Sequence, residues 1–382
     1  MGGYNVPQVR SVEAIALGYG FDESLAYGMA RGVTSRRETT LIRLTTSDGV
    51  VGWGEAWGPS GVTRAYLDLI RGYVEGSDLF AFQHVVSRVL STHYHFGIQN
   101  QMMSAISGLD IAIMDAQGRT LGLPVCQLIG GKARDRVPVY ASGGYITRDP
   151  RADFPGMLAR LEGAGCGAVK IKIGISPSSD EERVRLARET LGRDVLLLVD
   201  SNGNYTLDLA LESMARIAPY NVHWYEEPLA PQDFEGYRAL RRRGPIPVAT
   251  GEALYTAFEF KRLLDCGGAD IVQPDLSLCG GLSQGRLIAQ LAALHHVRLS
   301  PHVWGGAIGL AAACHYVASL PTYPHSLNVP RPTLVEYDVG DNALRDELLL
   351  EPVRLEDGDL VLPEGPGLGV EPDPLAIERF RI

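Results

Sequence analysis

Short apolar runs alternate with longer stretches of helical spacing from about residue 136 onward. The runs cover residues 137–141, 168–173, 195–199, 222–225, 246–249, 269–272 and 297–299. They recur about every 23 to 31 residues, the length that one strand, one helix and two loops require, and seven or eight such units can close a parallel barrel. An open doubly wound sheet is the alternative, but no GxGxxG sequence follows the first run. The pattern therefore favours an α/β fold built as a barrel.

The first 130 residues have a different pattern. Alternating apolar positions predict strands within residues 9–18 and 39–55, with a turn at Asp48-Gly49, and helical spacing predicts helices over 64–74, 81–91 and 102–121. Strands followed by helices indicate a separate α+β unit. Beyond about residue 348 the chain becomes polar and then rich in Gly and Pro. We expect this last segment to pack back on the first domain.

Composition and charge narrow the class of protein. The 382 residues are 45% hydrophobic and 21% charged, as in an ordinary globular chain, and the formal net charge of −10 comes from scattered acids and bases. A nucleic-acid partner is therefore not expected. The five cysteines form no CxxC pair, and we find neither a signal peptide nor an apolar stretch long enough to span a membrane. These features predict a cytoplasmic protein with no membrane association.

Ionisable residues end six of the apolar runs. They are Lys172, Asp200, Glu226, Glu252, Asp275 and His302, which follow one another at intervals of 23 to 28 residues. This spacing of one βα unit places each group at the carboxyl end of a successive strand, where the active sites of βα barrels are assembled. The sequence therefore predicts that these side chains converge on one pocket.

The residue types indicate a metal and two acid/base groups. Asp200, Glu226 and Glu252 would repel one another unless a divalent cation lies between them, and an all-oxygen set favours Mg²⁺. Lys170 and Lys172 share one strand face. We expect Lys172, with its pKa lowered by burial beside a cation, to act as a base, and Lys170 to contact an anionic substrate oxygen.

Asp275 and His302 would form the second acid/base group, in which the carboxylate orients the imidazole. Two proton-transfer groups would then face each other across a metal-bound substrate. This arrangement suits abstraction of the proton α to a carboxylate, because a cation can stabilise the enediolate that forms.

The motifs resemble those of the enolase superfamily, specifically its mandelate racemase subgroup. They are Lys170-x-Lys172, Asp200-Ser201-Asn202, Glu226-Glu227-Pro228, Gly251-Glu252, Gln273-Pro274-Asp275 and Ser300-Pro301-His302. The resemblance implies an N-terminal α+β capping domain over residues 1–130, a modified TIM barrel, (β/α)7β, over 131–350, and a C-terminal segment over 351–382 that packs on the capping domain. It implies Mg²⁺ on Asp200, Glu226 and Glu252, and the acid/base roles given above.

The resemblance also places Glu336, in Leu334-Val335-Glu336-Tyr337, at the end of the last barrel strand, where the family's glutamate hydrogen-bonds the substrate carboxylate or enolate. Asn202 and Trp304 are implied as substrate contacts. Two further segments that shape specificity in this superfamily match residues 19–34 and the loop around Trp53 and Trp57, so Tyr19 and Trp57 are also expected to contact substrate.

A narrower resemblance to acid-sugar lactone cycloisomerases rests on Pro301-His302-Val303-Trp304-Gly305 and on Cys279-Gly280-Gly281 after Asp275. It implies an acid sugar or its lactone as substrate, β-elimination after proton abstraction, and a homo-oligomer. Related sugar-acid dehydratases share these motifs, so ring opening and dehydration both stay open. Racemisation or epimerisation by two bases is the alternative reaction, and a non-catalytic metal-binding barrel is the alternative of another class.

Overall fold

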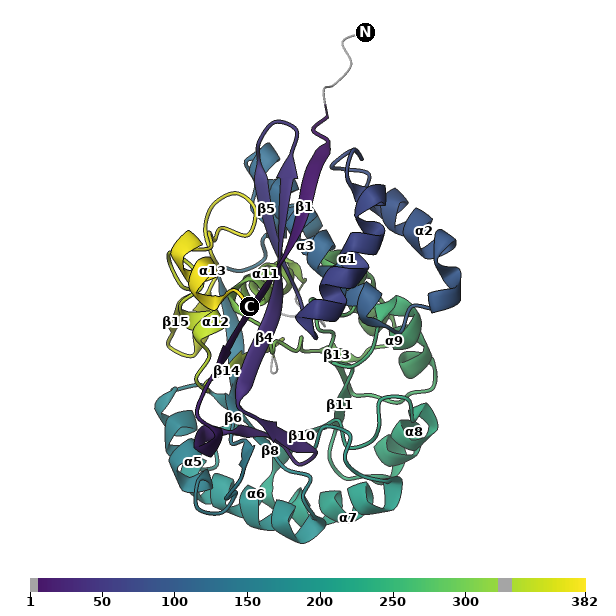
Figure 1. The fold of residues 1–382 in the computed structure, drawn as a ribbon. Helices are drawn as coiled ribbons and strands as arrows, with labels where there is room; N and C mark the ends of the chain where they lie inside the picture. The colour runs from purple at the N-terminus through teal and green to yellow at the C-terminus, as the bar shows by residue number, and fades with distance from the viewer. Residues whose placement is uncertain (1–5, 322–331) are drawn as a thin grey trace.

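The barrel wall consists of eight parallel strands in the computed structural model, which describes residues 6–321 and 332–382 (Figure 1). In chain order these are β6 Arg136–Gly143, β8 Ala168–Lys172, β9 Leu196–Asp200, β10 Val222–Glu226, β11 Val248–Thr250, β12 Ile271–Val272, β13 Arg298–Leu299 and β14 Val335–Asp338. Each is hydrogen-bonded to the next as far as β13, and β14 pairs with β6. Between β13 and β14, the Ser300 hydroxyl donates to the Leu334 carbonyl at 2.7 Å. The barrel therefore closes on its eighth strand.

Within residues 6–321 and 332–382, seven helices surround the barrel, one after each of the first seven strands. They are α5 Phe154–Gly163, α6 Pro177–Leu191, α7 Leu207–Ile217, α8 Phe234–Arg243, α9 Thr256–Asp265, α10 Gly281–Leu294 and α11 Ala307–Ser319. After the eighth strand, β14, the next described element is the short helix α12, Ala343–Asp346, which has four residues. This is the expected (β/α)7β barrel, so the predicted fold class is confirmed.

The interior of the barrel has an apolar layer and a polar layer. Alternation along β8 turns Val169 and Ile171 toward the surrounding helices and places Ala168, Lys170 and Lys172 on the opposite face. The apolar layer contains Tyr140, Ala168, Leu198, Trp224, Ala249, Ile271 and Leu334. The lysines and the carboxylates that end the strands lie beyond it, toward the carboxyl ends. Because alternate strand residues face the interior, the polar site lies directly above this packed apolar layer.

A separate α+β domain covers the carboxyl ends of the strands. Its antiparallel sheet has the order β1-β4-β5. Its elements are β1 Val9–Gly20, β4 Arg36–Thr46, β5 Val51–Ala56, α1 Ser60–Val74, α2 Phe82–Thr92, α3 Gln101–Leu121 and α4 Val125–Ile129. Gly52 and Gly54 lie against the backbone of α3, where a Cβ on either would collide with the carbonyls of Ala112 and Gly108. Trp53 is a buried residue of β5, which agrees with the strand expected within residues 39–55 and not with a loop around Trp53.

A hairpin crosses the barrel mouth within the segment 19–34. After the turn η1, Glu23–Leu25, it consists of β2 Tyr27–Met29 and β3 Gly32–Thr34. Strand β2 pairs with β7, Ile146–Thr147, which follows β6, and Arg31 at the tip donates to the Gly203 carbonyl, which follows β9. The hairpin is therefore held at both sides of the mouth (Figure 1).

The segment after residue 350 contacts both domains. Strands β15, Leu355–Glu356, and β16, Asp359–Val361, form a hairpin whose second strand pairs with the first residues of β6. Glu371 accepts hydrogen bonds from Trp53 Nε1 at 3.1 Å and from Arg119 at 2.8 Å, and helix α13, Pro374–Phe380, packs on β1. The segment thus links the cap sheet to the first barrel strand.

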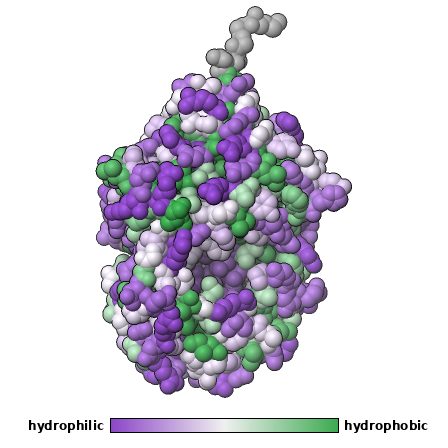
Figure 2. All heavy atoms as spheres, viewed as in Figure 1, coloured by the Kyte–Doolittle hydropathy of each residue, from purple (hydrophilic) through white to green (hydrophobic). Residues whose placement is uncertain are grey.

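The exposed surface is mixed in polarity. Figure 2 shows hydrophilic and hydrophobic residues interspersed, with a hollow at the barrel mouth that contains hydrophilic residues. In the part of the chain that the structure describes, we find no helix with the length and apolar character that crossing a bilayer requires.

Candidate active site

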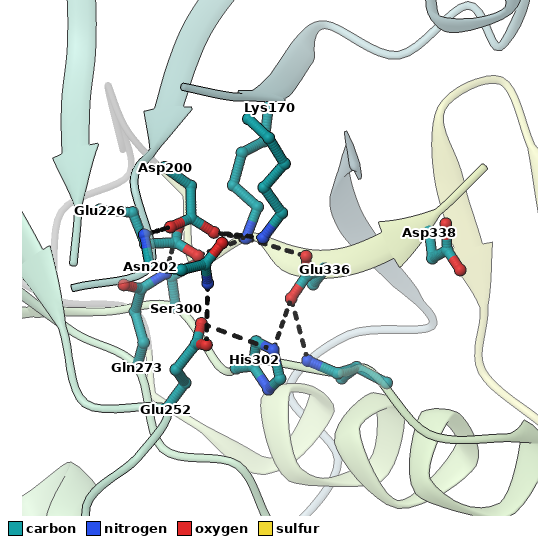
Figure 3. Close-up of polar contacts among 12 residues, drawn as sticks. Lys170, Asp200, Asn202, Glu226, Glu252, Gln273, Ser300, His302, Glu336 and Asp338 are labelled. Atoms are coloured by element: carbon teal, nitrogen blue, oxygen red, sulfur yellow. Dashed lines mark hydrogen bonds and ion pairs between the residues drawn. The ribbon is translucent and has the colours of Figure 1, made fainter. Parts of the chain in front are cut away.

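Three carboxylates meet at the carboxyl ends of neighbouring strands. Asp200 and Glu226 are the last residues of β9 and β10, and Glu252 follows β11 by two residues. Their oxygen atoms lie within 4.8 Å of one another (Figure 3). Glu252 Oε2 is buried without a hydrogen bond. A buried anionic oxygen without a donor is costly, so this all-oxygen set fits a hard divalent cation.

Glu226 is held in place by two donors that the sequence reasoning did not assign. Gln273 Nε2 and Trp224 Nε1 donate to Glu226 Oε2 at 2.7 and 3.1 Å. Burial, followed by the neighbouring carboxylates, raises the pKa of Glu226 to about 8 against the opposing effect of Lys170. Trp224 could have been assigned from the sequence, because it lies two residues before Glu226 and alternate residues of a strand share a face. Gln273 appeared in the sequence analysis as part of the motif Gln273-Pro274-Asp275, without a role of its own.

The two lysines of β8 lie beside these carboxylates and are almost completely buried. Lys172 Nζ is 2.5 Å from Asp200 Oδ2. Lys170 Nζ contacts Glu226, and it lies 2.9 Å from Glu336 Oε1. Burial disfavours the charged ammonium, but the nearby carboxylates outweigh burial and raise the pKa of both lysines. Without a cation, the nearest charged partner of Lys172 is the Asp200 carboxylate. The lowering of the Lys172 pKa was expected beside a bound cation, and for that state it stays a prediction.

His302 and Asp275 form the predicted pair on the other side of the site. His302 Nδ1 is 2.7 Å from Asp275 Oδ2, and His302 Nε2 lies 3.5 Å from Glu252 Oε2 and 3.6 Å from Glu336 Oε2. Burial acts to lower the pKa of His302, but the surrounding carboxylates raise it to about 10. The imidazole thus has one nitrogen fixed and the other directed into the site.

Glu336 lies between the lysine side and the histidine side of the site (Figure 3). It is in β14, where it pairs with Tyr140, and the Val303 N–H donates to its Oε2 at 3.2 Å. Burial acts to raise its pKa, but Lys170, His302 and Lys172 together hold the pKa below its ordinary value. The structure therefore brings Glu336 to the place that the resemblance implied.

Two of the four expected substrate contacts lie next to these groups. The Asn202 amide Nδ2 donates to Glu252 Oε1 at 3.3 Å, and its backbone, with φ of +47°, donates to Asp200 Oδ1 at 2.8 Å. The Trp57 ring is 6.1 Å from the His302 ring, centroid to centroid. Asn202 and Trp57 thus border the carboxylates and the imidazole.

Trp304 is held from the cap domain. The Arg37 guanidinium lies 4.2 Å from the centre of the Trp304 ring, and Tyr145 contacts the same ring edge-on. Arg37 forms a buried ion pair with Asp338 at the end of β14 and donates to Tyr27 of the hairpin at 2.5 Å. The position of the Trp304 ring therefore depends on contacts with both the cap domain, through Arg37, and the barrel, through Tyr145.

Tyr19 lies apart from the carboxylates. Its hydroxyl donates to the Asp341 carbonyl at 2.8 Å and accepts from the Ala343 N–H at 3.2 Å. It lines a separate cavity of about 560 Å³ together with Tyr27 and Tyr145. The structure does not bring Tyr19 to the other predicted site residues.

Comparison with known proteins gives a consistent identity. The model described as "Mandelate racemase / muconate lactonizing enzyme, N-terminal domain" matches residues 21–130, and the model "Enolase C-terminal domain-like" matches residues 156–376. D-galactarolactone cycloisomerase of Agrobacterium fabrum is 35% identical over 349 residues, which cover 91% of this chain and 92% of that protein. D-galactonate dehydratase of Ralstonia nicotianae is 33% identical, with 89% and 91% covered.

Solved structures agree with these matches. The 3,6-anhydro-D-galactonate cycloisomerase from Zobellia galactanivorans has a TM-score of 0.88 and 31% identity, covering 98% of this chain and 99% of that one. A racemase from Streptomyces coelicolor with bound magnesium has a TM-score of 0.84 and 27% identity, covering 98% and 100%. This chain therefore belongs to the mandelate racemase and muconate lactonizing enzyme family of the enolase superfamily, and it is, like its named relatives, an enzyme of the isomerase or lyase type.

Proposed function

We propose that this enzyme uses Mg²⁺ to remove the proton α to the carboxylate of an acid sugar or its lactone, and then eliminates the β oxygen. The observation that carries the proposal is the position of Glu336. Its carboxylate lies 2.9 Å from Lys170 Nζ on one side and 3.6 Å from His302 Nε2 on the other. Lys172 shares a strand face with Lys170. The lysine side and the histidine side therefore approach one place from opposite sides, as abstraction and return of a proton by Lys172 and His302 require.

Asp200, Glu226 and Glu252 would hold the cation. A bound Mg²⁺ supplies positive charge that stabilises an enediolate. The Lys170 ammonium adds a second positive charge beside Glu336 and Glu226. Its burial makes its electrostatic effect stronger than it would be in water. We assign Lys170 to the anionic oxygens of the substrate.

Lys172 and His302 are the proposed proton-transfer groups, at Nζ and Nε2. Asp275 fixes the tautomer and the direction of His302 through Nδ1. One of the two removes the α proton, and the other group, or the same one, protonates the leaving oxygen. If that oxygen closes a lactone or anhydro ring, the product is the ring-opened isomer, and if it is a free hydroxyl, water leaves.

Glu336 is the proposed hydrogen-bonding partner of the substrate carboxylate. In the structure its ordinary acidity is increased by the three cationic side chains around it. An anionic substrate oxygen beside Glu336 would raise the pKa of the carboxyl again, so that a proton can be shared between the two oxygens.

Elimination is favoured over racemisation by the relatives. The named cycloisomerase and dehydratases act, by their names, on sugar acids or their lactones. The two-base geometry also suits racemisation, which would leave the carbon skeleton intact. The cytoplasmic location and the homo-oligomeric state stay predictions.

The test is an exchange experiment. A panel of acid sugars and their lactones is incubated with enzyme and Mg²⁺ in D₂O, and the products are examined by NMR for deuterium at the α carbon, ring opening or an α-keto acid. We expect exchange and one of the two elimination products, and we expect Lys172→Met and His302→Asn to lose turnover. A product that differs only by an inverted stereocentre would establish the racemase instead. Failure of the whole panel to exchange would favour the non-catalytic barrel.

A further inference from the structure

The helix that follows the His302 loop receives its N-terminal cap from the other domain. The N-cap residue of α11 is Gly306, which has no side chain to accept a hydrogen bond. Instead, the fully buried carboxylate of Glu55, in β5 of the cap domain, accepts from the Gly306 and Gly309 N–H groups, the latter at 2.7 Å. Thr39 Oγ1 donates to the same carboxylate at 2.7 Å. Glu55 therefore satisfies N–H groups that a helix leaves without internal partners.

The approach of Glu55 depends on glycine. A Cβ on Gly305 would collide with Glu55 Oε1, and a Cβ on Gly306 would lie 3.3 Å from the same atom. The glycines that follow His302 thus let the cap carboxylate reach the helix. The opposite side of this loop is bound to the barrel, since the Val303 N–H donates to Glu336.

The helix that follows the Asp275 loop is capped in the same manner. The N-cap of α10 is Gly280, with φ of +109°, and it also provides no side-chain cap. Its N–H donates to Ser107 Oγ at 2.8 Å, and the Ser283 N–H donates to Asp110 Oδ2 at 2.9 Å. Ser107 and Asp110 both belong to α3 of the cap domain. Both members of the His302–Asp275 pair therefore precede a helix whose N-terminus is bound by the cap.

Two other barrel helices provide their own caps. In α6 the Ser176 side chain accepts from the Ser179 N–H at 3.2 Å, and in α8 the Asp233 side chain accepts from the Gly236 N–H at 2.8 Å. Neither helix follows a member of the His302–Asp275 pair. The contrast shows that capping from the other domain is not a general feature of this barrel.

We propose that Glu55 and Asp110 are positioning residues. By fixing the first turns of α11 and α10 to the cap domain, they hold His302 and Asp275 at hydrogen-bonding distance from each other. The role of the pair as an acid/base group rests on the proposed function. His302 and Asp275 lie four and five residues before the two N-cap glycines. A shift of the first turn of either helix would therefore move His302 or Asp275 and change the hydrogen bond between His302 Nδ1 and Asp275 Oδ2.

The test is the state of the His302 ring in Glu55→Gln and Asp110→Asn. Protein labelled with ¹⁵N-histidine gives the chemical shifts of both ring nitrogens through the carbon-bound protons, and His302→Asn assigns the His302 signals. We expect the His302 nitrogen shifts to change in both variants, because the bond to Asp275 lengthens. The control is Asp115→Asn. Asp115 is also buried in α3, but it accepts from the N–H groups of Trp53 and Leu368 and pairs with Arg119. Among the described residues, Asp115 forms no hydrogen bond or ion pair with either loop.

A milder pair of variants covers the case in which the first two do not fold. Thr39→Val removes one donor to Glu55, and Ser107→Ala removes the acceptor of the Gly280 N–H, while both carboxylates remain. We expect smaller changes in the same nitrogen signals. Unchanged His302 shifts in the folded variants, or equal changes in Asp115→Asn, overturn the proposal.

A kinetic readout separates this proposal from the proposed function. With a compound that exchanges in D₂O, we expect kcat to fall about 10- to 100-fold with KM nearly unchanged, the size of effect that a small misplacement of a reacting group produces. If no compound exchanges, the proposed function fails, but the nitrogen shifts still decide whether Glu55 and Asp110 position the pair.

Discussion

Asp275 Oδ2 and His302 Nδ1 form a hydrogen bond of 2.7 Å, which leaves Nε2 as the ring atom that faces Glu252 and Glu336. The carboxylate also accepts from the Ser277 N–H at 2.7 Å, so Asp275 is itself held by the backbone. A residue fixed in this manner can set both the tautomer and the direction of the imidazole. The pair is therefore the most specific point at which to test the proposed chemistry.

Asp275→Asn is expected to lower the rate of exchange or turnover by about 100-fold or more, because the amide no longer stabilises a charged imidazole and can present the wrong hydrogen-bonding group to Nδ1. The rate is measured by NMR in D₂O with the compound that the wild-type enzyme uses. Asp115→Asn serves as the control, since it removes a buried carboxylate elsewhere. A variant with the wild-type rate would show that Asp275 has no part in proton transfer.

Glu252→Gln is expected to weaken Mg²⁺ binding by at least about tenfold, because the amide is a neutral and poorer ligand in an all-oxygen set. Isothermal titration calorimetry with MgCl₂ measures this without substrate. For the wild-type chain, free Mg²⁺ at 100 times its dissociation constant should add about 2.7 kcal/mol to the free energy of unfolding, and EDTA should remove it. Equal binding by both proteins would place the cation elsewhere.

Arg37→Met is expected to destabilise the chain by about 3 to 5 kcal/mol, because it leaves the buried carboxylate of Asp338 without its cation. Thermal and urea unfolding measure the loss. The double variant Arg37→Met, Asp338→Leu should be more stable than Arg37→Met alone, since no unpaired charge then remains buried. If the second substitution adds a further full loss, the ion pair is not the reason for the destabilisation.

His315 predicts a loss of stability in acid. Its ring is fully buried, with Nδ1 accepting from the Cys126 N–H at 3.3 Å and Nε2 3.0 Å from the Leu368 carbonyl. Burial lowers the pKa of His315 to about 4, below the ordinary value of 6.5. The unfolded chain therefore binds this proton first, so the stabilising contribution is complete above pH 6.5 and is lost as the pH falls toward 4.

Between pH 6.5 and pH 5 the loss in the free energy of unfolding from His315 is about 2 kcal/mol, since each pH unit between the two pKa values is worth about 1.4 kcal/mol. Urea unfolding at several pH values, compared between the wild-type chain and His315→Gln, isolates the contribution. The variant should be less stable at pH 7.5 and should lose less stability on acidification. Parallel curves for the two proteins would contradict the assignment.

Much of the barrel could be predicted from the sequence because strand and loop lengths repeat. The residue that ends each apolar run lies at the carboxyl end of a strand in the structure, as the spacing of Asp200, Glu226 and Glu252 required. Glu336 could not be reached by spacing, since 34 residues separate it from His302, and the resemblance alone indicated it. Regular repetition makes the register predictable only where it is unbroken.

Contacts between the domains could not be predicted in the same way. Trp53 was expected in a loop and Tyr19 was expected to contact substrate, but Trp53 is in a buried strand and the Tyr19 hydroxyl donates to the Asp341 carbonyl. The capping of α10 and α11 was invisible as well, because the sequence shows only glycines at Gly280 and Gly306. Their acceptors come from residues more than 150 positions earlier, and no local pattern encodes such a partner.

The hairpin of β15 and β16 has a consequence for the order of folding. The first residues of β6 pair with β16, and the cap sheet is bonded to Glu371 and Ile382. Residues 351–382 are synthesised after the residues of the cap and of the barrel. Until that stretch is made, the first residues of β6, Arg136 to Pro138, lack their partner strand. We expect chains that stall before residue 351 to aggregate or to bind chaperones more than the full chain does.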